Sequence, residues 1–222
     1  YVDAINWSHW LLSADKVNGL AYASVNLPKA GWRDTHIAAH DVNGESLISA
    51  RLVVAHGNFA LENYQVAQAG YETLLRIMPA KDERVQALTN RLAATFFQQS
   101  ERLLASAKVK QTLAAPLPEG RNVAQLSETQ RRAVIDSVAF LQRIMQETPN
   151  STFRAAAQYD AATYLLASEN FTQALPLLLD FQIRFPKNDL VLSIPGKLLV
   201  AYEESEQWQP AAVLLMAQHK AQ

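Results

Sequence analysis

The sequence predicts an all-α protein in which successive helix pairs stack into a solenoid. Three observations predict this fold class. The 222 residues are 49% apolar, which is enough for a substantial core. Three segments repeat one helical pattern that stops at a proline. Each of these segments follows another striped stretch, as the second helix of a pair follows the first.

The repeated pattern places an apolar residue fifteen positions before a proline, from Tyr64 to Pro79, from Val134 to Pro149 and from Phe171 to Pro186. A small residue follows after three positions, and larger apolar residues follow four and seven positions later. In order these are Ala67, Tyr71 and Leu74; Ser137, Leu141 and Ile144; and Ala174, Leu178 and Phe181. This spacing predicts one buried helix face, and proline cannot continue a helix. Trp208, Ala211 and Leu215 repeat the opening of the pattern.

Each repeated helix has a predicted partner before it. We expect helices at 46–59 and 62–78, at 152–168 and from Phe171, and at 189–204 and 208–220. Short connections predict antiparallel neighbours. Asn170 is expected to cap the helix that starts at Phe171. Pro176 and the Pro195-Gly196 pair are expected to kink the helices they interrupt.

The stretch 80–149 is a longer repeat. Asp82 is expected to cap a helix that reaches toward Leu113, with the stripe Val85, Leu88, Leu92, Phe96, Leu103 and Leu104. A loop at 114–126 follows, containing the turn-rich residues 114–120. Ser127 with Gln130 is typical of a capping box that opens the next helix. The loop is either a projection that contacts a partner or tolerated surface length.

The pattern of apolar residues in 1–42 predicts N-terminal helices that belong to a remnant or divergent repeat. Trp7, Trp10 and Leu11 indicate one helix, and residues 33–40 a second. The Trp residues fill the end of the solenoid, pack against repeats that precede this fragment, or form an exposed binding patch. The chain begins Tyr-Val-Asp, without an initiator Met or a signal-peptide layout, so we expect a fragment of a longer protein.

The spacing of small residue, bulky residue and terminal proline resembles the tetratricopeptide repeat, a 34-residue helix–turn–helix unit. Matching positions in two repeats are Ala55, Ala67, Tyr71 and Pro79, and Ala162, Ala174, Leu178 and Pro186. Leu74, Ile144 and Phe181 depart from the family by replacing its Ala, and the signature Trp and Gly of the first helix are missing. The resemblance covers 43–222 and implies repeats at 43–79, 80–149, 150–186 and 187–222.

The resemblance also implies a right-handed superhelix whose concave face binds a protein or peptide. By the family pattern, the residues facing this groove are Leu52, His56, Tyr159, Thr163, Leu166, Val200 and Glu203. It further implies a bacterial envelope setting, periplasmic or outer-membrane-associated, with a cytoplasmic location as the alternative. The mixed chemistry of these residues predicts an apolar or mixed ligand.

The sequence nominates no catalytic site and no cofactor. His36 and His40 lie four apart beside Asp34 and Asp41, but the chain has no Cys, and we expect a solvated helix face there without a metal. No phosphate-binding loop and no nucleophile elbow occurs. Glu203, Glu204 and Glu206 are interpreted as a solvated helix end, with contact to a basic peptide as the alternative. We therefore expect a protein that is not an enzyme.

Charge and hydropathy exclude two classes of partner. The net charge of −1 argues against a general nucleic-acid binder. No apolar run approaches the 18 or so residues of a membrane span. The main hypothesis is a non-catalytic interaction scaffold. The alternative is a structural spacer, or a regulatory arm of a cell-wall or polysaccharide machine whose active part lies elsewhere. No pattern in the sequence indicates the oligomeric state.

Overall fold

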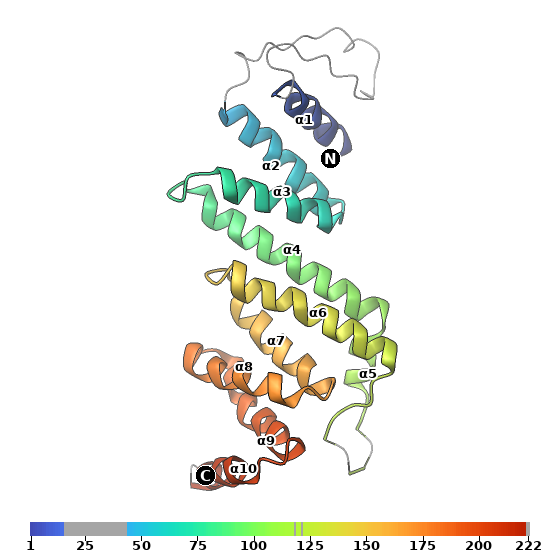
Figure 1. Ribbon diagram of the computed structural model, residues 1–222, viewed down its shortest axis with the longest axis vertical. Coiled ribbons are helices and arrows are strands. Elements are labelled where there is room, and N and C mark those ends of the chain that lie inside the picture. The colour runs from blue at the N-terminus through green and yellow to red at the C-terminus, as the bar shows by residue number, and fades with distance from the viewer. Residues whose placement is uncertain (16–43, 118, 121, 221–222) are drawn as a thin grey trace. The chain divides into compact units, whose positions relative to one another are not determined.

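The computed structural model describes residues 1–15, 44–117, 119–120 and 122–220, and these residues form helices without any strand (Figure 1). They divide into two compact units, Tyr1–Thr95 and Phe96–Gln222. The α-helices in chain order are α1 (Val2–Asp15), α2 (Gly44–Ala60), α3 (Tyr64–Ile77), α4 (Arg84–Ser106), α5 (Val109–Ala114), α6 (Glu128–Glu147), α7 (Arg154–Ala167), α8 (Phe171–Arg184), α9 (Ile194–Glu204) and α10 (Trp208–Lys220). No helix in these described ranges is both long and apolar enough to cross a membrane.

Helices adjacent in the sequence pack against one another, which confirms the predicted all-α class. In the first unit α2 contacts both α1 and α3. In the second unit α6 contacts α7, α7 contacts α8, α8 contacts α9, and α9 contacts α10. This arrangement is compatible with a helical solenoid.

The repeated pattern marks the buried face of α3, α6 and α8. All nine of its internal positions are at most 1% exposed: Ala67, Tyr71, Leu74, Ser137, Leu141, Ile144, Ala174, Leu178 and Phe181. Each helix also ends in the same way, with a backbone N–H bonded to the carbonyl of Leu74, Ile144 or Phe181. The fourth copy differs, because Ala211 in α10 is buried while Trp208 and Leu215 are exposed.

Three helix-to-helix turns share a geometry that the sequence pattern does not reveal. Glu62, Glu169 and Glu206 precede α3, α8 and α10, and each has a φ near +60°. In each turn the residue after the Glu donates its backbone N–H five residues back, as Asn170 does to Leu165 at 2.8 Å. This is the Schellman ending of a helix. Glycine usually occupies the left-handed position, because other L-residues are strained there.

The helix boundaries confirm one predicted cap and correct another. The Ser127 side chain accepts from the Gln130 backbone at 3.3 Å, and the Gln130 side chain accepts from the Ser127 backbone at 3.1 Å, which confirms the capping box. Asn170 occupies the N-cap position of α8, but its side chain caps nothing. Its amide instead donates to the Ser168 side chain at 2.9 Å, so the prediction of a side-chain cap was wrong.

Two predicted helices are divided. The helix expected to reach Leu113 ends at Ser106, because Lys108 adopts a left-handed φ of 55° before α5 begins at the fully buried Val109. The helix expected at 189–204 consists of the 3₁₀ helix η2 (Asp189–Ser193) and α9. Pro195 lies in the first turn of α9, where its missing N–H is not needed, so it starts a helix and does not kink one. Pro176 lies inside α8.

At the N-terminus, α1 includes Trp7 and packs on α2. A Cβ added to Gly57 of α2 would come within 2.7 Å of Ile5, so this glycine permits the close approach of α1. The predicted helix at 33–40, with His36, His40 and their neighbouring carboxylates, lies outside the described residues.

Candidate functional site

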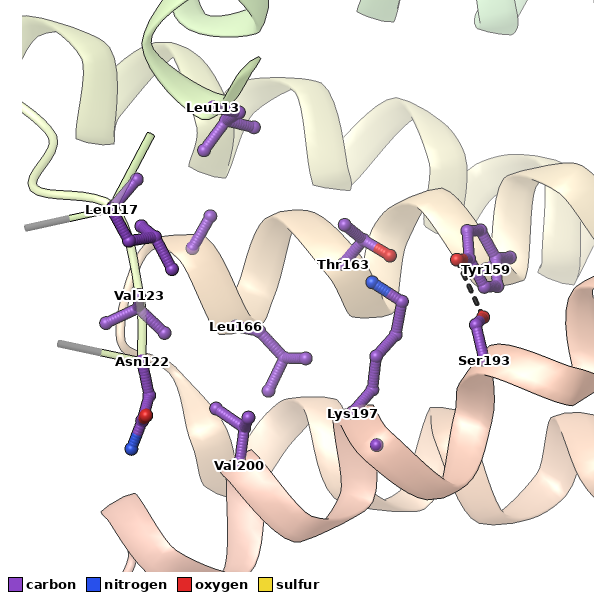
Figure 2. A pocket seen from close by; sticks show the side chains of 13 residues that line it. Leu113, Leu117, Asn122, Val123, Tyr159, Thr163, Leu166, Ser193, Lys197 and Val200 are labelled. Carbon is purple, nitrogen blue, oxygen red and sulfur yellow. Dashed lines mark hydrogen bonds between the residues drawn. The ribbon is translucent and has the colours of Figure 1, made fainter. Parts of the chain in front are cut away.

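Four of the seven predicted groove residues line one cavity of about 410 Å³ in the second unit (Figure 2). Tyr159, Thr163 and Leu166 come from α7, and Val200 comes from α9. A cavity of this volume falls in the range of ordinary small-ligand sites. It can accommodate one large side chain of a bound segment.

The two helices present equivalent stripes to the cavity. On α7 the lining positions 159, 163 and 166 are spaced four and three apart, which places them on one helix face. The α9 side repeats this spacing with Ser193 at its N-cap, then Gly196, Lys197 and Val200. The other stripe of α7 is buried, with Ala157, Ala161 and Leu165 at most 2% exposed. Core packing therefore fixes which face of α7 meets the cavity.

The opposite wall comes from α5 and from the connection between α5 and α6. Its lining residues are Leu113, Leu117, Asn122, Val123 and Ala124. The Asn122 amide donates to a Glu204 carboxylate oxygen of α9 at 3.1 Å. Gln130 of α6 donates to the Thr112 hydroxyl of α5 at 2.6 Å. These contacts hold the segment against both neighbouring helices.

One end of the cavity carries polar groups. The Tyr159 hydroxyl is hydrogen-bonded to the Ser193 hydroxyl at 2.9 Å. The Lys197 ammonium lies 5.1 Å from the centroid of the Tyr159 ring, a cation–π contact. Thr163 Oγ1 is buried without a hydrogen-bond partner. Among the described residues that line the cavity, Lys197 is the one that carries a charge.

Two ionisable residues of α7, the partly buried Asp160 and the buried Tyr164, lie next to lining residues in the sequence. Burial raises the pKa of Asp160, and the Glu101 carboxylate raises it further, whereas Lys110 and Lys197 lower it. Burial likewise raises the pKa of Tyr164, with Asp160 and Glu101 acting in the same direction. Asp160 is the nearest carboxylate in sequence to the lining residues, but it does not line the cavity. The two hydroxyls and the ammonium are groups that can form hydrogen bonds with a polar part of a ligand.

The remaining predicted groove residues lie elsewhere. Leu52 and His56 belong to α2 in the first unit. The His56 Nδ1 is hydrogen-bonded to the Tyr71 hydroxyl at 2.7 Å, and partial burial lowers the pKa of His56 while Arg91 lowers it further. Burial raises the pKa of Tyr71 to about 12. Glu203 of α9 is partly buried and does not line the cavity.

A second hollow of about 490 Å³ lies among α8, α9 and α10. Its lining is apolar or uncharged, as in Leu179, Tyr202 and Val213. No charged group there distinguishes one class of ligand from another. Within the part of the chain that the structure describes, no group of three or more His, Asp or Glu side chains is arranged to hold a metal ion.

Comparison with known proteins adds no relative: no family model, no curated protein and no solved structure matches the chain. The chemistry of the site therefore rests on its own residues. Sequence reasoning did not nominate Lys197. It gave the loop at 114–126 as a possible contact with a partner, but it did not place Leu117, Asn122 and Val123 opposite α7 and α9. The only signal for that wall was the length of the loop, which does not tell where a loop folds.

Proposed function

We propose that this chain is a non-catalytic interaction scaffold that binds a protein or peptide segment on the face formed by α7 and α9. In this proposal the helix pairs are antiparallel and form a right-handed, tetratricopeptide-like superhelix. The α7 and α9 face belongs to its concave side. The chain is a segment of a larger bacterial envelope protein, located in the periplasm or at the outer membrane.

One observation carries the proposal. Two successive first helices, α7 and α9, direct equivalent stripes into a single cavity. The family pattern independently nominates Tyr159, Thr163, Leu166 and Val200 for ligand contact. The hollow of about 410 Å³ that these stripes share is open to the surface and leaves room for a ligand side chain.

The binding proposal is tested with a displayed library of random peptides selected on the immobilised chain. We expect enriched peptides, and their affinity is then measured by fluorescence anisotropy on two variants. Val200→Lys places a charge at the cavity. Val213→Lys is the matched control, because it makes the same change at a 62% exposed position of α10.

We expect Val200→Lys to abolish most binding and Val213→Lys to leave binding unchanged. If both variants bind the peptides as tightly as the wild-type chain does, the binding surface lies elsewhere. Circular dichroism of both variants shows whether the helices are intact. A chain that enriches no peptide contradicts the proposal outright.

A structural spacer or regulatory arm is the second candidate. It is favoured by the apolar face of α10, where Trp208, Val213 and Met216 are each more than 60% exposed. Stacked helical repeats ordinarily bury such a face against a neighbour. In this case the cavity binds nothing, and selection yields no peptide that depends on Val200.

A further inference from the structure

We propose that the cavity is a socket for one bulky apolar side chain of the ligand with an acidic side chain next to it. We further propose that the described residues at the end of α5 and between α5 and α6, namely Leu113, Leu117, Asn122, Val123 and Ala124, create this preference. This inference rests on the proposed binding function. It names the ligand class, which the α7 and α9 face alone does not determine.

The cavity is divided into an apolar end and a polar end. Figure 2 shows Leu113, Leu117 and Val123 facing Leu166 and Val200 at one end. Tyr159, Ser193, Thr163 and Lys197 lie at the other end. A ligand that fits both ends must itself be apolar at one point and polar at the neighbouring point.

At the apolar end of the cavity, part of the apolar surface is exposed to water. Leu117 is 46% exposed, although it faces other apolar side chains. Covering such surface with an aliphatic or aromatic side chain is favourable in proportion to the area removed from water. The volume of the cavity admits one such side chain, and this defines the socket.

The described residues of the polar end offer hydrogen-bond donors and one positive charge. Lys197 extends from α9 toward α7, where its ammonium can donate three hydrogen bonds (Figure 2). The Tyr159 and Ser193 hydroxyls already pair with each other. Thr163 Oγ1 is buried without a partner, and such groups are rare in native proteins. A carboxylate complements Lys197, and hydrogen bonds to charged groups are the strong ones.

The segment between α5 and α6 turns the face formed by α7 and α9 into a socket. Without it, α7 and α9 would present an open groove of Tyr159, Leu166 and Val200. With it, Leu117 and Val123 form an opposite wall, and the Asn122 bond to Glu204 holds that wall to α9. Preference for a bulky apolar side chain should therefore depend on Val123, which belongs to no repeated helix.

The test uses peptides enriched by the wild-type chain, synthesised with amidated C-termini so that a carboxylate can come only from Asp or Glu. We expect each peptide to share one large apolar residue beside one acidic residue. Changing the apolar residue to Ala should weaken binding to the wild-type chain about tenfold to a hundredfold. Changing the acidic residue to its amide should weaken it about threefold to tenfold.

Two variants assign these losses to the socket. Val123→Lys should remove the discrimination between the apolar and the Ala peptide. Lys197→Gln should remove the discrimination between the acid and the amide. In such cycles, a loss that disappears shows that the two groups interact. Val213→Lys is again the control, and it should preserve both discriminations.

The outcomes separate this inference from the proposed function. If peptides bind through Val200 but both discriminations survive in Val123→Lys and Lys197→Gln, the socket is wrong and the binding face is right. The socket is equally wrong if the enriched peptides bind through Val200 but share no large apolar residue. If no peptide is enriched, or if Val200→Lys leaves the affinity unchanged, both the proposed binding function and the proposed socket are wrong.

Discussion

The turn after α7 and the turn after α4 begin alike and end differently. Each helix stops at a non-glycine residue in the left-handed conformation, Glu169 after α7 and Lys108 after α4. After Glu169 the chain enters α8 within two residues. After Lys108 it first forms α5 and the segment that ends at Ser127, and only then α6. A left-handed residue other than glycine thus precedes both a direct repeat and an insertion.

The direct repeats and the insertion contribute to different properties of the chain: the repeats to stability and the insertion to ligand recognition. The direct repeats supply the fully buried stripes of α3 and α8. The insertion supplies partly exposed side chains such as Leu117, which line a cavity. Substitutions in the stripes should therefore act on the free energy of unfolding. Substitutions in the insertion should act on binding and leave stability nearly unchanged.

The largest contrast is expected between Phe181→Ala and Leu117→Ala. Phe181 is fully buried and contacts the rings of Tyr159 and Phe185, so its loss leaves a large cavity. We expect a decrease of about 3–5 kcal/mol in the free energy of unfolding. Leu117→Ala should lower it by about 1 kcal/mol or less, since much of that side chain stays in water. Urea titration measures both values, and similar losses would remove the distinction between stripe and insertion.

A smaller effect is expected where helices approach closely. A Cβ added to Gly70 of α3 would come within 2.9 Å of the Ala55 Cβ, whereas one added to Gly196 of α9 would meet nothing within 4 Å. Gly70→Ala should destabilise the chain by about 1–3 kcal/mol through overpacking. Gly196→Ala should stabilise it by about 0.5–1 kcal/mol, because alanine loses less entropy in a helix. Thermal unfolding of both variants reveals the sign, and a stabilising Gly70→Ala would contradict the close approach of α2 and α3.

Glycine substitutions at the left-handed residues test whether the helix endings at Glu206 and Lys108 carry the same steric strain. Glu206→Gly and Lys108→Gly should each stabilise the chain by about 0.5–1 kcal/mol, because glycine adopts a positive φ without steric strain. Glu206→Ala and Lys108→Ala are the controls and should bring no gain. Differential scanning calorimetry resolves such shifts. A gain at Glu206 without one at Lys108 would mean that the two endings are not alike.

The weakest effect concerns the start of α4. The hydrogen bonds that Asp82 accepts from Arg84 lower its pKa to about 2, against an ordinary value of 3.8. A lowered carboxyl pKa stabilises the fold above the unfolded value, and this contribution disappears as the pH falls from about 4 to about 2. Asp82→Asn should therefore be less stable than the wild type at pH 7 and equally stable near pH 2. A difference that persists at pH 2 would mean that the carboxylate charge is not the cause.

The sequence predicted the repeated framework because that framework depends on local rules. The spacing of Ala67, Tyr71 and Leu74 identifies a buried helix face, and Ser127 with Gln130 identifies a helix start. The left-handed glutamates were not foreseen, because turn statistics favour glycine at such positions. Asn170 lies at the N-cap of α8, but its side-chain oxygen accepts no backbone N–H of that helix, and its amide donates to Ser168.

The candidate site was predicted only on its helical side. Tyr159, Thr163, Leu166 and Val200 were nominated by the family resemblance, and they line the cavity. Lys197 lies on the same face of α9, yet a lone lysine gives no signal in a sequence. The wall from Leu113 to Ala124 depends on long-range contacts such as Asn122 with Glu204, eighty-two residues apart. No local pattern encodes such a contact.

The most direct test of binding at the cavity is methyl NMR of the chain, with labelled Leu and Val, as an enriched peptide is added. We predict that the perturbed methyl groups cluster at Leu117, Val123, Leu166 and Val200, which line the cavity from both walls. Val213 on α10 and Val53 on α2 should keep their shifts. Perturbations concentrated on α10 or on α2, with the cavity methyl groups unmoved, would contradict binding at the cavity.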